Sequence, residues 1–221
     1  MTTKLVSLNN RSNPNRLSVA SYLSAAQCAA SLLNRGGVIA VPTDTVYGLA
    51  CLAQNKNAVK RLFQIKQRNN DRPISICVGS IQDIPKYCKI GVKVMPLLND
   101  LLPGPVTLLL KALPYINKSL IPKTNLVGLR IPDHPFMIHV AQLCNAAIAL
   151  TSANKSNETS CLNIKEFKQL WPDLDAIFDG STLGTIDPMR LGSTIVDLSV
   201  EGDFRIIRNG CALDYVKKIL C

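Results

Sequence analysis

Short apolar segments alternate with amphipathic ones along most of the chain, and this alternation constrains the fold more than any other feature of the sequence. Runs such as 106–110 and 146–150 are far too short to cross a membrane, so they predict buried strands. Elsewhere apolar residues recur at three- and four-residue spacing, as Val59, Leu62 and Phe63 do, which predicts a helix. We expect strands at 38–41, 73–78, 106–111, 126–131, 147–151, 175–178, 193–198 and 204–208, and helices at 22–34, 56–66, 80–88, 92–102, 135–144, 163–170 and 212–220. This alternation predicts an α/β domain around one twisted sheet.

The composition is that of one domain of generous size. Hydrophobic residues make up 47% of the 221 residues, enough to fill a core, and we expect a single domain at 22–221 behind a flexible tail at 1–21. The first 43 residues contain no Asp or Glu but several Lys and Arg, which is similar to a mitochondrial presequence. The alternative is a short polar tail before the first helix. We therefore expect a cytoplasmic protein, with a mitochondrial location as the second option.

The net charge and the spacing of the cysteines and histidines narrow the classes of function that this chain can have. A net charge of +10 favours phosphate-bearing partners such as nucleotides or tRNA, although a protein can be basic without one. Aromatic residues at 5% argue against a base-stacking RNA platform. Eight cysteines without a CxxC spacing predict small core residues in a reducing compartment, not a zinc ribbon. His134 and His139 lack clustered partners, so no metal site is expected.

Two polar pairs follow apolar segments and predict a ligand site. Lys66 and Arg68 end one helical segment, and Ser152 and Asn154 directly follow a predicted strand. Cations with a hydroxyl and an amide suit an anionic, phosphorylated substrate. The alternatives are a solvated basic helix end for the first pair and an ordinary Ser/Asn turn for the second.

Six segments in fixed order resemble one known family. They are VPTDTVYGLA (41–50), LLPGPVTLLL (101–110), VGLRIPDHP (127–135), LTSAN (150–154), LGSTIVDL (191–198) and IIRNG (206–210). Together with the two polar pairs they resemble the YrdC family of threonylcarbamoyl-adenylate synthases, over about residues 24–220. The resemblance implies a single α/β domain with a mixed sheet, flanking helices and an open, positively lined cavity.

The resemblance also implies a reaction. L-threonine, bicarbonate or CO2, and ATP with Mg2+ would yield threonylcarbamoyl-AMP and pyrophosphate, for the threonylcarbamoyladenosine of ANN-decoding tRNAs. The product would pass to a downstream tRNA threonylcarbamoyltransferase complex, and contact with tRNA or double-stranded RNA would be secondary. One alternative is a non-catalytic RNA-binding module that uses the same basic cavity, and another is a related carbamoyl-adenylate enzyme with a different substrate.

The family pattern assigns roles residue by residue. It makes Lys66, Arg68, Ser152 and Asn154 catalytic; the nucleotide contacts it implies are Lys66, Arg68, Ser152, Ser160 and Arg208, and the threonine contacts are Thr43, Arg130 and Ser193. Candidates of less certain role are Arg72, Thr107, Arg190 and Thr194. Thr43 has the alternative of a turn hydroxyl, and Arg130 that of a structural salt bridge.

This chain departs from the common family pattern in the loop after Arg68 and near its end. Asp71, Arg72, Pro73 and Ile74 stand in place of Asn-Pro-Leu, Cys77 in place of a histidine, and Asn209 in place of a proline. The second domain of longer relatives is not in this sequence, so we expect either that any lid over the cavity comes from elsewhere or that the active site stays more open.

Overall fold

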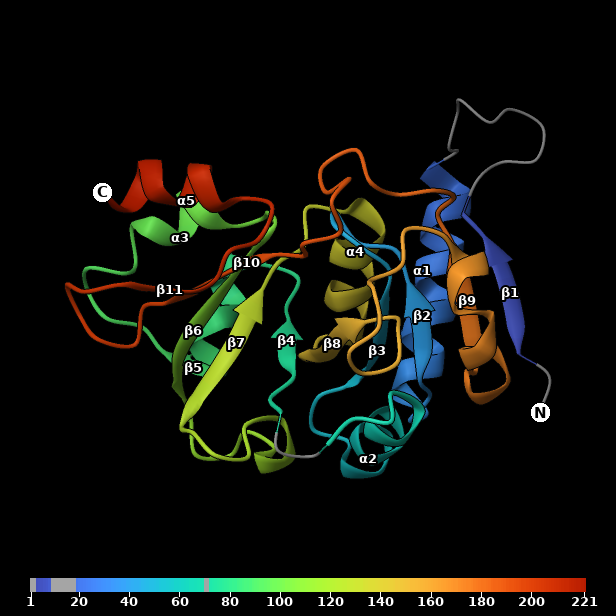
Figure 1. Ribbon diagram of the computed structural model, residues 1–221. Coiled ribbons are helices and arrows are strands. Elements are labelled where there is room, and N and C mark those ends of the chain that lie inside the picture. Colours follow the sequence, from blue (N-terminus) through green and yellow to red (C-terminus); the bar gives the residue numbers. More distant parts are fainter. Residues whose placement is uncertain (1–2, 9–18, 70–71) are drawn as a thin grey trace.

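The computed structural model describes residues 3–8, 19–69 and 72–221. Within them, eleven strands form one sheet, in the order β1-β9-β2-β3-β8-β4-β7-β6-β10-β11, with β5 paired to β6 (Figure 1). The strands are β1 Lys4–Ser7, β2 Ile39–Val41, β3 Gly48–Leu52, β4 Ser75–Cys77, β5 Cys88–Lys89, β6 Val106–Ala112, β7 Leu126–Arg130, β8 Ile148–Ser152, β9 Ala176–Asp179, β10 Thr194–Asp197 and β11 Arg205–Arg208. The pairs β4–β7 and β6–β10 are parallel, whereas β3–β8 and β6–β7 are antiparallel. The sheet is therefore mixed, as expected.

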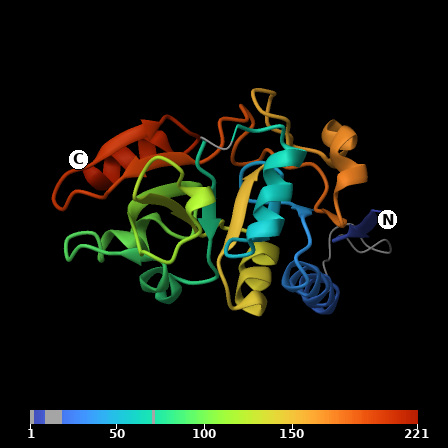
Figure 2. The ribbon, with the colours of Figure 1, turned by 90° about the horizontal axis from the view of Figure 1, so that it is seen from below.

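Helices cover both faces of the sheet. α1 (Val19–Asn34) and α4 (Pro135–Cys144) pack side by side on one face, and α2 (Lys56–Ile65) covers the other (Figure 2). α1 presents buried alanines such as Ala26 and Ala29, whose small side chains let the helix lie close to Phe136 of α4. The side chain of Asn55 caps α2 by accepting the backbone N–H of Ala58 at 3.0 Å. The α/β prediction is confirmed.

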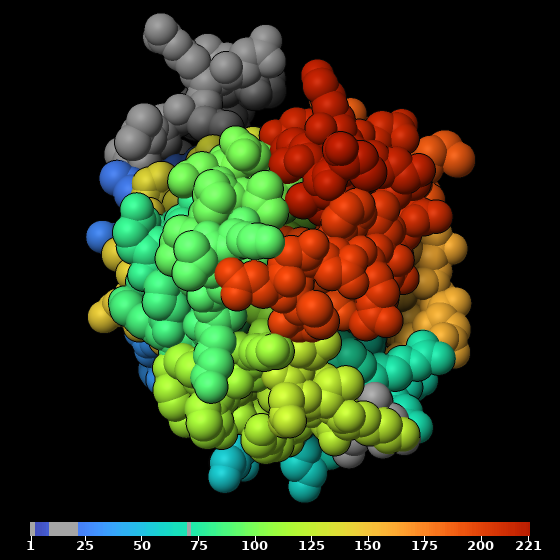
Figure 3. Space-filling view, turned by 90° about the vertical axis from the view of Figure 1, so that its left-hand side faces the viewer, coloured from blue at the N-terminus to red at the C-terminus, as the bar shows by residue number. Residues whose placement is uncertain are grey.

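The shorter helices gather toward the end of the sheet that holds β10 and β11. α3 (Leu97–Leu101) and α5 (Leu213–Leu220) contact each other there, so the C-terminal segment lies beside the segment that precedes β6 (Figure 3). The remaining helical turns are 3-10 helices, η1 (Ile81–Lys86), η2 (Lys118–Leu120) and η3 (Ile164–Asp173). The helices expected at 80–88 and 163–170 are present as 3-10 helices, and each contains a proline, Pro85 or Pro172, that lacks the N–H of an α-helical hydrogen bond. The helix expected at 92–102 begins only after Pro96.

Three strands were not expected from the sequence, namely β1, β3 and the two-residue β5. β3 follows the polar turn at 42–47 and is buried between β2 and β8. β1 pairs in parallel with β9, and Leu8 beyond it is 1% exposed. The prediction of a flexible tail was therefore wrong for residues 4–8, because the β9 edge offers backbone partners to any extended segment that can bury an apolar side chain. The rest of the tail lies largely outside the described residues.

In the described part of the chain, no helix is long and apolar enough to cross a membrane.

Candidate functional site

A cavity of about 190 Å³ lies where the turn before β3, the end of β8 and the start of β10 meet. Its predicted lining residues are Thr43, Arg68, Arg130, Ser152, Ser160, Ser193 and Arg208, seven of the nine expected site residues. One member of each polar pair, Arg68 and Ser152, reaches the cavity, because β3, which leads into α2, pairs with β8 and places Gly48 in register with Ser152. A Cβ at Gly48 would lie 2.7 Å from Leu150 Cδ1, so the glycine permits this close approach. Lys66 and Asn154 do not line the cavity.

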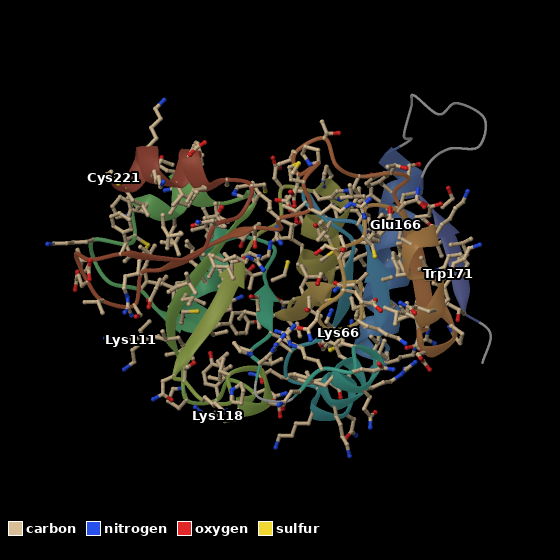
Figure 4. All side chains as sticks on the ribbon, in the orientation of Figure 1. Lys66, Lys111, Lys118, Glu166, Trp171 and Cys221 are labelled. Atoms are coloured by element: carbon tan, nitrogen blue, oxygen red, sulfur yellow. The ribbon has the colours of Figure 1, made fainter. Side chains whose placement is uncertain are left out.

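Lys66 lies beneath the cavity instead. It caps the C-terminal end of α2, is 1% exposed, and its Nζ donates to the backbone oxygens of Ser152 and, at 2.7 Å, Asn154 (Figure 4). Burial lowers the pKa of Lys66 to about 7, with a further contribution from the charge of Arg68. A neutral amine still has two N–H groups, enough for both carbonyls. The geometry therefore makes Lys66 a residue that holds the end of β8 in place.

Arg68 faces the cavity, two residues beyond Lys66. Its Nη2 donates to the backbone oxygen of Pro73 at 2.9 Å, and its Nε is buried without a partner in the described structure. Arg72, the third expected cation, instead donates to Asn157 Oδ1 at 2.9 Å and does not line the cavity. Arg68 thus lines the cavity, whereas Arg72 is engaged outside it.

Asn154 organises the loop after β8. Its amide Nδ2 donates to the backbone oxygens of Lys155 and Glu158 at 2.8 and 2.7 Å, and the residue is 6% exposed. The backbone N–H of Ser156 donates to the Lys66 oxygen at 2.9 Å, which closes the loop onto the end of α2. Asn154 therefore shapes the loop that follows Ser152, while its Oδ1 is buried without a partner among the described residues.

Arg130 ends β7 and forms a buried ion pair with Asp44. The side chains of Arg130 and Asp44 are 10% and 0% exposed, and the second carboxylate oxygen of Asp44 accepts the backbone N–H of Asp133 at 2.9 Å. Arg130 nevertheless lines the cavity, and its Nε has no partner in the described structure. Arg130 therefore forms the structural salt bridge that was the alternative, and it also lines the cavity.

The turn between β2 and β3 carries Thr43. Its hydroxyl donates to the Val46 oxygen at 2.7 Å and accepts the Thr45 N–H at 3.1 Å, so the turn-hydroxyl alternative is also realised. The hydroxyl of Tyr47, in the same turn, donates to the Ser181 oxygen at 2.8 Å and accepts the Gly180 N–H at 2.9 Å. These bonds fix the turn against the segment after β9.

Ser193 and Arg208 form the far wall of the cavity. Arg208 donates from Nε and Nη2 to the Ser193 backbone oxygen at 3.0 and 2.7 Å, and the Ser193 and Thr107 hydroxyls lie 2.8 Å apart. Partial burial and then the like charge of Arg130 lower the pKa of Arg208, so these two cations lie near each other. Gly210 allows this packing, because a Cβ there would lie 2.3 Å from Thr194 N.

The remaining candidates lie in the wall of the cavity or outside the cavity. Arg190 donates to the Ser160 oxygen at 3.0 Å and pairs with Glu166, so it positions Ser160 without lining the cavity. Thr107 lines the cavity, whereas Thr194 is buried and its hydroxyl accepts the Ala212 N–H at 3.1 Å.

Sequence reasoning missed several residues that build the site. Asp44 was the first acidic residue of the chain and followed a buried strand, a signal that could have marked it as the partner of Arg130. Asp187, fully buried, accepts the N–H groups of Leu191 and Gly192 at 2.8 and 2.6 Å and so holds the approach to Ser193. Ser75 lines the cavity beside Gly128, with no signal in the sequence.

The family model Sua5_yciO_yrdC, described as telomere recombination, matches residues 31–210. This chain belongs to the YrdC/Sua5 family. A Homo sapiens threonylcarbamoyl-AMP synthase is 47% identical over 203 residues, which cover 91% of this chain and 72% of that protein.

Solved structures of YrdC/Sua5 proteins share the fold. The crystal structure of P. abyssi Sua5 complexed with L-threonine superposes with a TM-score of 0.85 at 27% identity, over 99% of this chain and 61% of that one. The E. coli YciO structure has a TM-score of 0.77 at 21% identity, over 95% and 96% of the two chains. The family and the fold expected from the sequence are confirmed.

Among the departures from the common YrdC pattern, Pro73 and Ile74 line the cavity and Cys77 lies behind it, whereas Asp71 is outside the described residues. Cys77 is fully buried in β4, in register with Arg130 of β7, and does not line the cavity. Burial raises the pKa of its thiol to about 12, so Cys77 is a neutral packing residue behind the ion pair of Arg130 with Asp44.

Proposed function

We propose that this chain is a threonylcarbamoyl-AMP synthase, a nucleotidyltransferase that supplies the threonylcarbamoyladenosine modification of tRNA. Relatives at 46–47% identity over at least 90% of the chain bear this name. The observation that carries the proposal is the cavity lining, in which three arginines face one space and no Asp or Glu does among the described residues. Such a lining suits two anionic substrates that must approach each other.

The nucleotide would lie on the side of Arg68. Its guanidinium can donate to two phosphate oxygens, and the hydroxyls of Ser152 and Ser160 border the same space. Mg2+ would enter as part of MgATP, because the metal is usually held by substrate phosphates with one or two carboxylates, and Asp44 is already engaged by Arg130.

Threonine would lie on the side of Arg130, whose guanidinium can receive the substrate carboxylate. Thr43 and Ser193 bring hydroxyl groups to this part of the cavity. Arg208, bonded to Ser193, adds a second cation within electrostatic range of Arg130. Asp44 would keep Arg130 extended toward the substrate.

The chemistry proceeds by positioning and charge neutralisation. The threonine amine adds to CO2, or to bicarbonate with loss of water, and forms a carbamate. A carbamate oxygen then bonds to the α-phosphorus of ATP, and the bond from that phosphorus to the bridging oxygen breaks with release of pyrophosphate. Fixed arginines lower the repulsion between carbamate and triphosphate.

The deciding experiment is pyrophosphate release from MgATP and bicarbonate with L-threonine, with serine and valine as controls. We expect threonine-dependent release, with the KM for ATP raised at least about tenfold in Arg68→Ala, the loss expected for one charge-assisted hydrogen bond. Arg72→Ala is the matched control, since Arg72 bonds Asn157 outside the cavity, and it should retain the wild-type KM.

Other outcomes of this experiment point to the alternatives. Release that depends on a different amino acid would favour a related carbamoyl-adenylate enzyme. Salt-sensitive RNA binding by folded protein without any release would favour a non-catalytic RNA-binding module.

Compartment and downstream partner form part of the same proposal. The eight cysteines are unpaired and five are buried, which suits a reducing compartment such as the cytosol, with mitochondria as the second option. The labile product would pass to a tRNA threonylcarbamoyltransferase complex. Fractionation of cells that express the tagged full-length chain would test the compartment.

A further inference from the structure

The segment that joins β9 to β10 borders the cavity on the side of the proposed threonine contact. It comprises residues 180–193, and we call it the strap (Figure 1). Leu191, Gly192 and Ser193 at its end line the cavity. The position of Ser193 in the cavity therefore depends on how the strap is held.

The strap lies along residues 160–166, which begin with the proposed nucleotide contact Ser160. The backbone N–H of Leu183 donates to the Leu162 oxygen at 2.8 Å. A Cβ at Gly184 would lie 3.0 Å from Leu162 Cδ1, so the strap lies close to this segment. Two segments that would contact opposite substrates are thus bonded to each other.

Arg190 of the strap makes the contact nearest to Ser160. Its Nη1 donates to the Ser160 backbone oxygen at 3.0 Å and to Glu166 Oε2, while its Nη2 lies 3.4 Å from Glu166 Oε1. The side chains of Arg190 and Glu166 are 33% and 34% exposed, and such exposed ion pairs contribute little to stability. A carboxylate that holds a guanidinium at two points does, however, fix its orientation.

The backbone at Arg190 is strained, and Asp187 holds it. Arg190 has a φ of 59°, a left-handed conformation that is unfavourable for a residue with a side chain. The Asp187 backbone oxygen accepts the Arg190 N–H at 3.1 Å, and its carboxylate oxygens accept the N–H groups of Leu191 and Gly192 at 2.8 and 2.6 Å. Asp187 therefore maintains the turn in which Arg190 contacts Glu166 and Ser193 follows two residues later.

Arg190 thereby ties Ser160 to the strap that ends in Ser193. Each substrate would have a cation of its own, Arg68 for the triphosphate and Arg130 for the threonine carboxylate, so binding itself does not require Arg190. The step that joins the substrates does require a fixed spacing, because a carbamate oxygen must approach the α-phosphorus in line. We propose that Arg190 is a positioning residue that sets the spacing between the two bound substrates. The inference rests on the proposed function.

The test separates kcat from KM in Arg190→Ala. Pyrophosphate release by the full chain should show a kcat lowered at least about tenfold, because the reacting groups are no longer held at a fixed spacing. The KM values for ATP and for threonine should each stay within about threefold, since Arg68 and Arg130 are unchanged.

Arg61→Ala is the matched control. Arg61 also bonds a carboxylate and a backbone oxygen, those of Asp175 and Asp173, but it does not line the cavity. Its substitution should leave kcat at the wild-type value. Thermal unfolding of both variants shows whether they lose comparable stability, and an equal fall of kcat in both would assign the effect to general destabilisation.

Glu166→Ala tests whether the ion pair acts as a unit. Without the carboxylate the guanidinium of Arg190 loses its fixed orientation, so this variant should also lower kcat. The double variant should be no slower than Arg190→Ala alone, because both changes remove the same contact. Fully additive losses would contradict the proposal.

Other results would also overturn it. An unchanged kcat in folded Arg190→Ala would remove the positioning role. A rise confined to the KM for ATP would mean that Arg190 supports only the nucleotide contact of Ser160 and does not set the spacing. No release by the wild type would remove the proposed function together with this inference, whereas an active wild type with a normal Arg190→Ala variant would remove this inference alone.

Discussion

Arg130 is held in the cavity by Asp44, whose two carboxylate oxygens bond the Arg130 guanidinium and the Asp133 backbone N–H. Asp44→Asn keeps the size of the side chain but removes the charge. Under the proposed function we expect the KM for threonine to rise about tenfold, the equivalent of about 1.4 kcal/mol, while the KM for ATP stays within about twofold. Steady-state pyrophosphate release with each substrate varied measures both.

Asp133→Asn provides the control for this pair. The contact of Asp133 with Asp44 runs through its backbone N–H, so the substitution should leave the KM for threonine unchanged. An unaltered KM for threonine in Asp44→Asn would mean that Arg130 needs no carboxylate to face the substrate.

Because the pKa of Lys66 is lowered, the free energy of unfolding should depend on pH in an unusual way. This pKa is about 7 in the folded protein against 10.5 for an ordinary lysine, so the folded state binds fewer protons between these values. The free energy of unfolding therefore rises with pH across this window, by at most about 1.4 kcal/mol per unit. Below about pH 7 the lysine is charged in both states and the full penalty of burying it remains.

Lys66→Gln is the reference for that measurement. The Gln amide has two N–H groups for the Ser152 and Asn154 oxygens but does not titrate. Urea denaturation of both proteins at several pH values from about 7 to 9 gives the comparison. A constant difference between them would refute the lowered pKa.

Gly210 is a second position at which we expect a substitution to have a clear effect. A Cβ there would lie 2.3 to 2.5 Å from backbone atoms of Gly192, Ser193 and Thr194, none of which is a flexible side-chain end. Gly210→Ala should lower the free energy of unfolding by about 1–3 kcal/mol and displace Ser193, with loss of pyrophosphate release. Thermal unfolding and activity assays check both effects.

Gly91→Ala is the control for this backbone clash. Its Cβ would contact only the Glu201 side chain, at 3.4 Å or more, so stability and activity should stay close to wild type. A similar loss in both variants would show that glycine flexibility, and not the contact with Ser193, explains the effect.

Tyr47→Phe tests the link between the Thr43 turn and the segment after β9. The change leaves the Gly180 N–H and the Ser181 oxygen without the Tyr47 hydroxyl, and we expect a loss of about 1–3 kcal/mol of stability. Tyr215→Phe, which removes an exposed bond to Asp100, should lose much less. Chemical denaturation of the two variants measures the difference, and equal losses would contradict the structural role of Tyr47.

Local sequence patterns were sufficient to predict much of the fold. The boundaries of α4 follow from Pro135 and from Asn145 after the last apolar residue, and the apolar runs located β6, β7 and β8 within one or two residues. β3 escaped prediction because its burial depends on β2 and β8 on either side, which lie far apart in the sequence. The edge pairing of β1 with β9 is equally non-local.

The sequence by itself determined the α/β class, the family and the polar residues that gather at the cavity, because periodicity and motif order are local properties of the chain. Only the tertiary structure decided where those side chains point. Lys66 and Arg68 stand two residues apart, yet Lys66 turns inward to two carbonyls of β8 and its loop, while Arg68 faces the cavity. That division arises from the packing of the β8 loop on the end of α2, where the backbone oxygens of Ser152 and Asn154 accept hydrogen bonds from the buried lysine.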